Sequence, residues 1–340
     1  MNLSLQTEGF EAKARRILAE CYGLAPATLH PLNFTGAVFK DVCRVEAGGT
    51  AYVLKRYRSD FRSGQDLTAI HQAQEYLMRK GLPVAPVLPD REGRLVTGDG
   101  GHCWVLYAWV EGRHQRPEQI PDRRAALLGA TLARLDLELG GWETDWPGAE
   151  PFYALLPAES IARFEELLRL AERGSGPRDQ LAVQVLRYRI EALDRLAPLA
   201  PRIIPMERQW VHGDPNEGNF LWEGDRITAI IDFDNMRWAP RGFDFMYALT
   251  SHFPSGSPAR EAFARAYLGA VRPTPAELEL YAPMWAYTQL CDIWPIDELY
   301  LRPANFHPSW EIDPPSDRWE RQIGPLTDWL LRLQAAGPLS

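Results

Sequence analysis

The residues best suited to chemistry lie close together in one segment, residues 210–247. The polar residues of interest in this segment are His212, Asp214, Asn219, Asp232 and Asp234. Carboxylates that converge are costly unless a proton or a cation compensates their charge. Oxygen ligands of this kind suit Mg²⁺, which binds one or two carboxylates together with phosphate oxygens and water. The segment therefore indicates a metal-assisted reaction on a phosphate compound.

The spacing within the segment narrows the reaction further. Asn219 follows Asp214 by five residues, which is the distance in protein kinases between the catalytic Asp and a metal-binding Asn. Asp232 then stands where those enzymes have a later metal-binding Asp. A polar hairpin is the alternative interpretation, because loop Asp and Asn side chains often only stabilise turns. Turn stabilisation could explain any one of these residues by itself. The presence of the whole set at this spacing favours phosphoryl transfer.

A strand–loop–strand–turn–strand unit must position these side chains. Val211 ends one apolar run, residues 223–225 form a turn, and residues 227–231 form a buried strand. We expect this arrangement to turn Asp214 and Asp232 toward one space. Pro215 restricts the backbone of Asp214 to extended angles, which fixes the direction of its carboxylate.

The segment resembles that of the aminoglycoside phosphotransferase/choline kinase family, which shares the protein-kinase-like fold. The residues that match the family's HGDxxxxN pattern are His212, Gly213, Asp214 and Asn219. Residues 231–234 match its IDFD pattern. The resemblance implies that Asp214 is the catalytic base for an acceptor hydroxyl, that Asn219 and Asp232 hold Mg²⁺, and that ATP is the phosphoryl donor.

Two other residues of the segment fit supporting roles. Asp244 matches an acid that often follows in this family at the start of a helix, and we expect its carboxylate to cap that helix by accepting backbone N–H groups. We expect His212 to brace the loop by hydrogen bonding rather than to act as a base.

The nucleotide is expected to bind to the first 110 residues. Lys55 lies in the third predicted strand, where kinases carry a phosphate-binding lysine, although a strand lysine by itself is usually a solvated edge residue. Glu75, on the helix that follows, is the best acidic candidate to orient Lys55 through an ion pair.

Two connecting segments complete the expected nucleotide site. Residues 33–37 would cover the phosphates, with Thr35 and Gly36 in place of a GxGxxG loop; the single glycine still allows backbone N–H groups to approach a phosphate. Residues 107–110 resemble the kinase hinge, whose backbone reads the adenine edge, so Tyr107 and Trp109 are expected beside the nucleotide.

The hydrophobic pattern around these residues predicts an α+β chain. A helix over residues 9–22 precedes strands and one further helix, residues 67–80, and helical periodicity dominates after residue 112. Together with the resemblance, this predicts a two-lobe, protein-kinase-like fold. The N-terminal lobe, residues 1–110, would be a small antiparallel sheet with one helix, and residues 111–340 a larger, mostly helical lobe.

Composition excludes several classes of protein. The 340 residues include 37 Lys+Arg and 45 Asp+Glu, a net charge of −8, and 46 % are hydrophobic. This apolar content excludes disorder as the dominant state, and the acidic balance without long basic runs argues against a nucleic-acid partner. No apolar run approaches the ~20 residues of a membrane span, so no membrane partner is expected. The negative charge suits a cationic small molecule.

The four cysteines add a prediction about location. They lie far apart and include no CxxC pair, which is typical of neither a zinc site nor a disulfide framework. The start of the chain also lacks the order of a secretion signal. We therefore expect a cytoplasmic protein.

The acceptor is expected to meet the helical lobe at residues 285–301. This stretch combines aromatic and acidic residues: Trp285, Asp292, Trp294, Asp297 and Glu298. Aromatic faces beside carboxylates suit an amine or ammonium group, whereas an amphipathic helix with its aromatic side in the core is the alternative. Amino sugars, homoserine and choline are acceptors in relatives of the family.

The sequence thus predicts an ATP- and Mg²⁺-dependent phosphotransferase that acts on a hydroxyl of a small, amine-bearing molecule. A protein Ser/Thr kinase of the same fold is one alternative, but the short stretch between Asp232 and Asp244 contains no recognisable activation segment. A non-catalytic nucleotide-binding scaffold protein is the other. The presence of the base and both metal-binding residues argues against it.

Overall fold

The computed structural model describes residues 3–32, 40–58, 62–115, 120–148, 157–303, 306 and 310–337. The chain forms two compact units, which are described separately. The first unit comprises Met1–Gln115, Gly141–Ala149 and Gly218–Met236, and the second comprises Arg116–Gly140, Glu150–Glu217 and Arg237–Ser340. The lobes expected over residues 1–110 and 111–340 remain a prediction.

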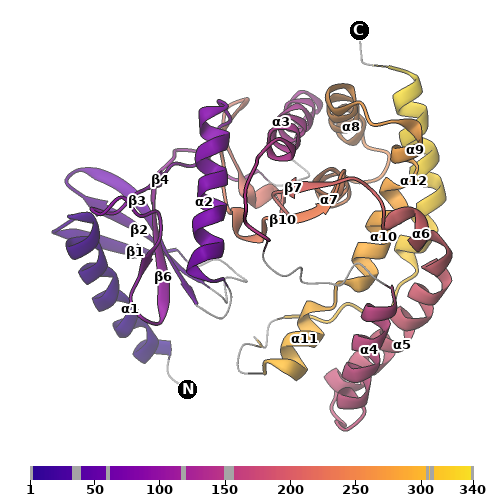
Figure 1. The fold of residues 1–340 in the computed structure, drawn as a ribbon, viewed down its shortest axis with the longest axis horizontal. Helices are drawn as coiled ribbons and strands as arrows, with labels where there is room; N and C mark the ends of the chain where they lie inside the picture. Colours follow the sequence, from indigo (N-terminus) through magenta and orange to yellow (C-terminus); the bar gives the residue numbers. More distant parts are fainter. Residues whose placement is uncertain are drawn as a thin grey trace. The chain divides into compact units, whose positions relative to one another are not determined.

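The first unit is built on an antiparallel sheet with the strand order β1-β2-β3-β6-β4, and β5 pairs with β6 (Figure 1). Its strands are β1 (Ala27–Pro31), β2 (Lys40–Ala47), β3 (Thr50–Arg58), β4 (Val87–Leu88), β5 (Thr97–Gly98) and β6 (His102–Ala108). Its helices are α1 (Leu3–Ile17), which continues as a π-helical turn over Leu18–Tyr22, and α2 (Gly64–Arg79). A separate hairpin joins β8 (Phe220–Glu223) to β9 (Arg226–Ile230).

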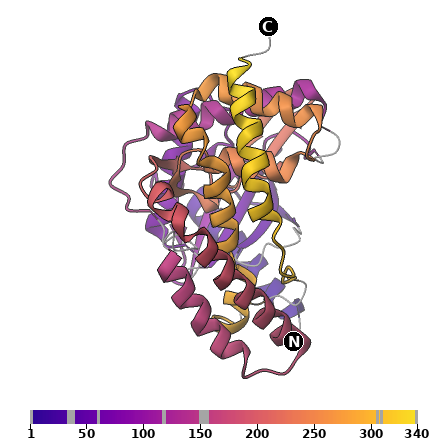
Figure 2. The same ribbon diagram turned by 90° about the vertical axis from the view of Figure 1, so that its right-hand side faces the viewer.

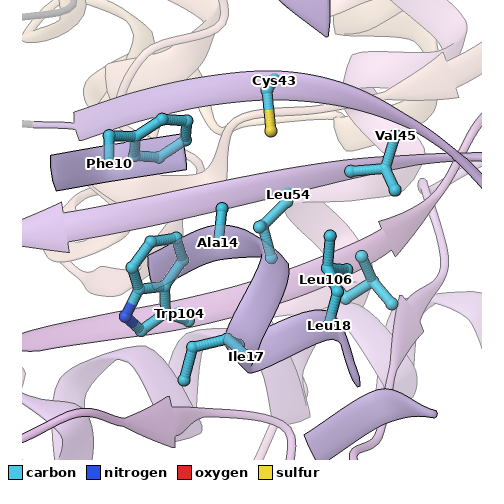
Figure 3. Close-up of a cluster of buried hydrophobic side chains, with 9 residues drawn as sticks. All are labelled: Phe10, Ala14, Ile17, Leu18, Cys43, Val45, Leu54, Trp104 and Leu106. Atoms are coloured by element: carbon cyan, nitrogen blue, oxygen red, sulfur yellow. The ribbon is translucent and has the colours of Figure 1, made fainter. Parts of the chain in front are cut away.

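The two helices of the first unit cover opposite faces of its sheet. Trp104 and Leu106 of β6 belong to the cluster around α1 (Figure 3), whereas Val105 and Tyr107 belong to the cluster that includes Leu67 of α2. This alternation follows from the two-residue period of a strand. By the same rule, Lys55 of β3, whose register partner is Val105, lies on the α2 face.

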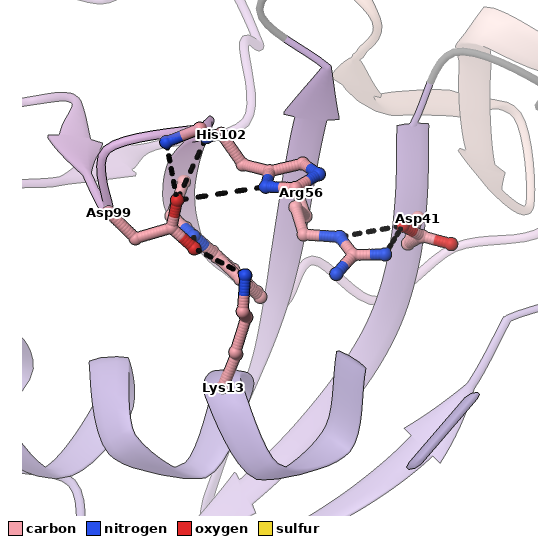
Figure 4. A network of polar contacts seen from close by, with 7 residues as sticks. Lys13, Asp41, Arg56, Asp99 and His102 are labelled. Carbon is pink, nitrogen blue, oxygen red and sulfur yellow. Dashed lines mark hydrogen bonds and ion pairs between the residues drawn. The ribbon is translucent and has the colours of Figure 1, made fainter. Parts of the chain in front are cut away.

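A polar network connects α1 to the turn between β5 and β6 (Figure 4). The Asp99 carboxylate lies 3.7 Å from the Lys13 ammonium of α1, and the His102 backbone N–H donates to it at 2.8 Å. Arg56 of β3 donates to Asp41 of β2 through Nε at 2.7 Å. These contacts stabilise the scaffold on the α1 face.

Helix α2 begins three residues earlier than its hydrophobic pattern predicts, because a capping box extends it. The backbone N–H of Asp66 donates to the Ser63 hydroxyl, and the Ser63 backbone N–H donates to the Asp66 carboxylate, each at 3.1 Å. Such reciprocal bonds satisfy two of the donors that a helix start leaves unpaired. Trp146 also donates to Asp66, at 3.0 Å, and so ties residues 141–148 to this unit.

The second unit is mostly helical (Figures 1 and 2). Its helices are α3 (Asp122–Gly140), α4 (Pro157–Ala171), α5 (Pro177–Leu196), α6 (Ala200–Ile203), α7 (Phe243–His252), α8 (Pro258–Val271), α9 (Pro275–Leu278), α10 (Tyr281–Cys291), α11 (Trp294–Leu301) and α12 (Arg318–Ala335). Two short strands, β7 (Arg208–Val211) and β10 (Arg237–Pro240), pair antiparallel. Helix α3 packs on α8, α4 on α5 and α10 on α12.

Close contacts pack α8 against both α3 and α7. Gly129 lets α3 and α8 approach closely, since a Cβ at this position would lie 2.2 Å from the Phe263 carbonyl oxygen. Phe245 of α7 stacks on Phe263 and on Tyr267 of α8, with ring centroids 5.8 and 4.4 Å apart. Helix α7 is therefore held by aromatic contacts on the side that faces α8.

The structure confirms the predicted fold class and most predicted elements. Strands β4 and β10 were not predicted. Each is short, and β10 contains Pro240 and follows a turn, so neither has a clear alternating pattern. None of the helices in the described part of the chain has both the length and the apolar content of a bilayer-spanning helix.

Candidate active site

The loop that carries Asp214 leaves β7 in the second unit. Val211, the last residue of β7, pairs with Arg237 of β10. Gly213 has a φ of 81°, a left-handed conformation that favours glycine. The backbone therefore turns sharply between the buried His212 and Asp214.

Asp244 holds this loop through hydrogen bonds to its backbone. Its side chain is fully buried, and its two carboxylate oxygens accept the backbone N–H groups of His212 at 2.7 Å and Gly213 at 2.9 Å. The expectation that Asp244 caps its own helix is wrong, because Gly242 (φ 84°) occupies the cap position of α7. The carboxylate does satisfy free backbone donors, but they belong to the loop.

A second buried aspartate, missed by the sequence analysis, lies beside Asp244. Asp136 of α3 is 2 % exposed, and the Tyr267 hydroxyl donates to its Oδ2 at 2.6 Å. Burial raises the pKa of Asp136 well above its usual range, and the negative charge of Asp244 raises it further. The signal was present in the sequence: Asp136 falls four residues after Leu132, within the apolar stripe of its helix.

Asp214 itself is oriented by two side-chain donors. The amide of Asn216 donates to Oδ1 at 2.8 Å, and the hydroxyl of Tyr247, on α7, donates to the same oxygen at 2.7 Å. The Asp214 backbone N–H donates to Nδ1 of His212 at 3.3 Å, so His212 braces the loop as expected. Nε2 of His252 lies 2.7 Å from the Pro215 carbonyl oxygen and holds the next residue. The loop thus presents a carboxylate of fixed orientation.

The expected metal-binding residues lie on either side of the β8–β9 hairpin of the first unit. Phe220 pairs with Ile230, and the Ile231 N–H donates to the carbonyl oxygen of Asn219 at 3.0 Å. Asn219 therefore lies next to the chain that leads into Asp232. Asp232 adopts a left-handed conformation with φ 66° and ψ 55°, which a non-glycine residue rarely adopts and which is often found at functional sites.

Lys55 lies between two carboxylates that follow β9. Its Nζ is 2.9 Å from Oδ1 of Asp232 and 3.6 Å from Oδ2 of Asp234. Burial alone would lower the pKa of Lys55, but the charges of Asp232 and Asp234 outweigh it and raise the pKa above its usual value. The lysine is therefore a fixed cation and not the solvated edge residue of the alternative interpretation.

The predicted ion pair between Lys55 and Glu75 is not formed. Among the described residues, Lys55 pairs with Asp232 and Asp234 alone. Helix α2 turns His71 and Gln74 inward, both almost fully buried, while Glu75 is only half-buried. The helix thus offers a neutral ring to the interior, since burial and the Lys55 charge lower the pKa of His71 to about 3.

The remaining expected nucleotide-site residues divide into three groups. Tyr107 lies by Lys55, with its ring centroid 5.3 Å from Nζ and its hydroxyl 2.8 Å from Nε2 of His71. Trp109 donates to Glu111 at 2.8 Å and lies under Arg44. Thr35 and Gly36 lie outside the described residues.

The donor set of the first unit fits Mg²⁺ bound together with a nucleotide. The described residues include no group of three or more His, Cys, Asp and Glu side chains that could hold a metal alone. Asn219 and Asp232 are instead one amide and one carboxylate, and Mg²⁺ usually binds few protein ligands and completes its shell with phosphate oxygens and water. Asp214 belongs to the second unit, so its convergence with Asp232 remains a prediction.

Of the expected acceptor residues, one is linked by contacts to Asp214. The Trp285 ring lies edge-on to Tyr247, with centroids 5.6 Å apart, and Trp319 lies edge-on to Trp285 at 6.3 Å. Nε1 of Trp285 is buried and has no hydrogen-bond partner among the described residues. Trp294 instead contacts Trp310, with centroids 4.4 Å apart.

The acidic residues of the same stretch already face arginines. Asp297 pairs with Arg163, and Glu298 pairs with Arg302. Burial raises the pKa of Asp292, and the nearby Arg189 charge opposes the rise. None of the three is thus an unopposed anion, and the amine expectation gains no support from them.

Comparison with known proteins gives a family match over most of the chain. Residues 35–281 match the group described as the phosphotransferase enzyme family (APH). A protein of Deinococcus radiodurans R1, described only as uncharacterized, is 25 % identical over 268 residues, which are 75 % of this chain and 72 % of that protein.

Solved structures show the same fold at low sequence identity. An amicoumacin kinase in complex with AMP-PNP, Ca²⁺ and Ami has a TM-score of 0.63 and 17 % identity, and the match covers 100 % of this chain and 98 % of that one. A spectinomycin phosphotransferase in complex with ADP and spectinomycin has a TM-score of 0.63 at 13 % identity, covering 96 % and 97 %. A microcompartment-associated aminopropanol kinase has a TM-score of 0.58 at 17 % identity, covering 94 % and 95 %.

Proposed function

Because the chain belongs to the phosphotransferase enzyme family, and is therefore a kinase with a protein-kinase-like fold, we propose that it transfers the γ-phosphoryl group of ATP to a hydroxyl of a small, amine-bearing molecule. The observation that carries this proposal is the position of Lys55, held at 2.9 Å from Asp232 and 3.6 Å from Asp234. A buried cation beside carboxylates suits the binding of a metal-complexed phosphate chain, where both charges find partners.

Asp214 is the proposed base. In the reaction the acceptor oxygen forms a bond to the γ-phosphorus, the bond from that phosphorus to the bridging oxygen of ADP breaks, and the acceptor proton passes to Asp214. Tyr247 and Asn216 hold Oδ1 of Asp214 at 2.7 and 2.8 Å. This fixed orientation favours proton transfer, because a positioned base does not have to reorganise during the reaction.

Residues of the first unit would balance the negative charge of the nucleotide phosphates. Lys55 would contact the phosphates, and Asn219 and Asp232 would hold a divalent cation. Mg²⁺ is the natural candidate, because it prefers oxygen ligands such as these. The bound cation would neutralise charge that develops on the transferring phosphate. The side chain of Asp232 is 26 % exposed, so it can exchange its contact with Lys55 for one with a ligand.

A small acceptor is supported by the chain that follows Asp232. A short 3₁₀ turn, Phe233–Asn235, leads into β10 and then into α7 at Phe243. This path contains no long loop that could position a protein substrate. The amine is supported by the acceptors named for two similar folds, spectinomycin and aminopropanol, and by the half-buried ring of Tyr247 beside Asp214, which suits a cationic group; Trp285 is a core residue.

The test is ADP release from Mg–ATP with a panel of acceptors: aminoglycosides, aminopropanol, homoserine, choline and a generic protein substrate. The Asp214→Ala variant serves as the blank. It should lose turnover by roughly two to four orders of magnitude and should bind Mg–AMP-PNP like the wild type. One amine-bearing acceptor that raises the rate of the wild type alone would support the proposal.

Three other outcomes would contradict it. Turnover with the protein substrate alone would indicate a protein kinase. Tight nucleotide binding without turnover on any acceptor would favour a scaffold protein. Normal turnover in Asp214→Ala would exclude Asp214 as the base.

A further inference from the structure

We propose that Asp234, oriented by a hydrogen-bonded chain from His71 through Tyr107 and Tyr57, is the permanent counter-charge of Lys55 and replaces the glutamate that the sequence suggested on α2. The proposal rests on the proposed function, because it concerns how the nucleotide-binding lysine is positioned. It names Tyr57, Tyr107 and His71 as positioning residues, since none of them is expected to touch the reacting atoms.

The chain of contacts is continuous and buried. Nε2 of His71 is 2.8 Å from the Tyr107 hydroxyl, which is 3.2 Å from the Tyr57 hydroxyl. The Tyr57 hydroxyl donates to Oδ1 of Asp234 at 2.9 Å. His71 and Tyr57 are fully buried, and Asp234 and Tyr107 are 3 % and 6 % exposed. Hydrogen bonds in such a setting are not exchanged for water, so they hold their groups in one orientation.

The number of available protons sets the donor and acceptor of each hydrogen bond between His71 and Asp234. A carboxylate only accepts hydrogen bonds, so the single hydroxyl proton of Tyr57 goes to Asp234. The contact between the two tyrosines then uses the proton of Tyr107, and the contact between Tyr107 and His71 uses a proton on Nε2 of His71. We therefore infer that His71 is the neutral Nε2–H tautomer. Nδ1 of His71 is buried without a hydrogen-bond partner among the described residues, which suits the unprotonated nitrogen of this tautomer; in the other tautomer the tyrosine pair would lack a bridging proton.

Asp234 is better suited than Asp232 to keep Lys55 in place. The side chain of Asp234 is 4 % exposed against 26 % for Asp232. Nε of Arg62 also donates to the carbonyl oxygen of Asp234 at 3.0 Å, so both its backbone and its side chain are fixed. When Asp232 turns to a cation, Asp234 remains beside Lys55. A lysine that loses one partner thus keeps the other.

The experiment measures nucleotide affinity without turnover. Mg–AMP-PNP is titrated into the wild type, Tyr57→Phe, Tyr76→Phe and Glu75→Gln by calorimetry, and far-UV circular dichroism verifies folding. Tyr57→Phe removes only the hydroxyl that orients Asp234 and should raise the Kd about tenfold. Tyr76→Phe is the matched control, because Tyr76 lies on α2 outside the chain of contacts, and its Kd should equal that of the wild type.

A second pair of variants tests His71, the first residue of the hydrogen-bonded series. His71→Gln keeps a side-chain N–H donor and should retain most of the affinity, whereas His71→Leu should lose as much as Tyr57→Phe. If the variants Tyr57→Phe and His71→Leu fold and bind like the wild type, or if Glu75→Gln alone weakens binding, the inference is overturned. A wild type that does not bind Mg–AMP-PNP would instead contradict the proposed function.

The tautomer can be measured in the protein without nucleotide. Long-range ¹H–¹⁵N spectra of histidine-labelled protein report which ring nitrogen carries the proton, and loss of one of seven sets of signals in His71→Gln gives the assignment. A protonated Nε2 is expected. A protonated Nδ1 would break the chain of donors and overturn the inference, whatever the nucleotide does.

Discussion

The buried pair Asp136–Asp244 predicts an unusual dependence of stability on pH. Both oxygens of Asp244 accept backbone N–H groups of the loop before Asp214, so Asp244 is the ionised partner. Asp136 accepts a bond from Tyr267 on Oδ2, while its buried Oδ1 has no donor among the described residues. An oxygen that itself carries a proton needs no donor. The folded protein therefore keeps a proton on Asp136, shared with Asp244.

The groups around this pair favour that arrangement. The facing titratable side chains are Tyr267 on α8, His212 on the loop, and Arg237 and Arg241 on and just after β10. Burial raises the pKa of Asp136 first, and the Asp244 charge raises it further, against smaller opposing effects of the Tyr267 hydrogen bond and of Arg241. In the unfolded chain the same carboxyl titrates near pH 4.

The sign of the effect follows from these two states. A pKa raised on folding stabilises the protein fully below the unfolded pKa, and this contribution is lost as the pH rises toward the folded pKa. While the folded state alone retains the proton, the free energy of unfolding falls by about 1.4 kcal/mol per pH unit. Between pH 5 and pH 7 the Asp136 proton should thus account for a decrease of up to about 2.7 kcal/mol.

Asp136→Asn removes this dependence and keeps a donor toward Asp244. Urea unfolding at 25 °C is followed by tryptophan fluorescence at pH 5, 6, 7 and 8. The free energy of unfolding of the variant should rise relative to that of the wild type as the pH rises. Asp194→Asn is the matched control, because it makes the same substitution at an exposed position of α5. A wild-type-minus-variant difference that stays constant over this range would show that Asp136 is ionised in the folded protein, and would refute the reasoning.

Two further predictions follow from the second unit. Tyr247→Phe removes one of the two donors to Asp214 and should lower kcat about tenfold without changing the KM for ATP; Tyr188→Phe, which removes a hydroxyl bonded to Glu320, is the control, and an equal loss in both would speak against a positioning role. Gly129→Ala places a Cβ 2.2 Å from the Phe263 carbonyl oxygen and should cost about 1–3 kcal/mol of stability, measured by thermal unfolding; an unchanged midpoint would mean that α3 and α8 can separate without loss.

The residues with chemical roles could be predicted from the sequence because their spacing is short and local. Asp214 lies in a loop, and Asn219 and Asp232 lie just before and just after the β8–β9 hairpin, which spans only residues 220–230. Apolar periodicity likewise predicted α2 and the main strands of the sheet. In these cases local pattern and final structure agree.

The partners of Lys55 could not be predicted, since they depend on which residues of α2 point inward. Glu75 and His71 are four residues apart on α2, and both were compatible with a position facing Lys55. The capping box at Ser63 and the apolar positions Leu67 and Ile70 set the rotation of the helix. That rotation buries His71 and leaves Glu75 at the margin. Helix periodicity predicts a face, but a site can depend on one residue within it.

Four aspartates of residues 210–247 show how partners decide what one side chain does. Asp244 accepts backbone donors that cannot move away, so it is committed to holding the loop. Asp234 accepts a buried tyrosine hydroxyl and stays beside Lys55.

Asp214 and Asp232 differ from these two in how readily they can change partner. Asp214 has side-chain donors on one oxygen, which orients it without neutralising it, as a base requires. Asp232 shares Lys55 with Asp234 and is the more exposed of these two carboxylates. A carboxylate bound by backbone donors serves the fold, whereas one that shares its cation with a second carboxylate can leave it to bind another cation. This difference makes Asp232 the natural ligand for a metal that arrives with its nucleotide.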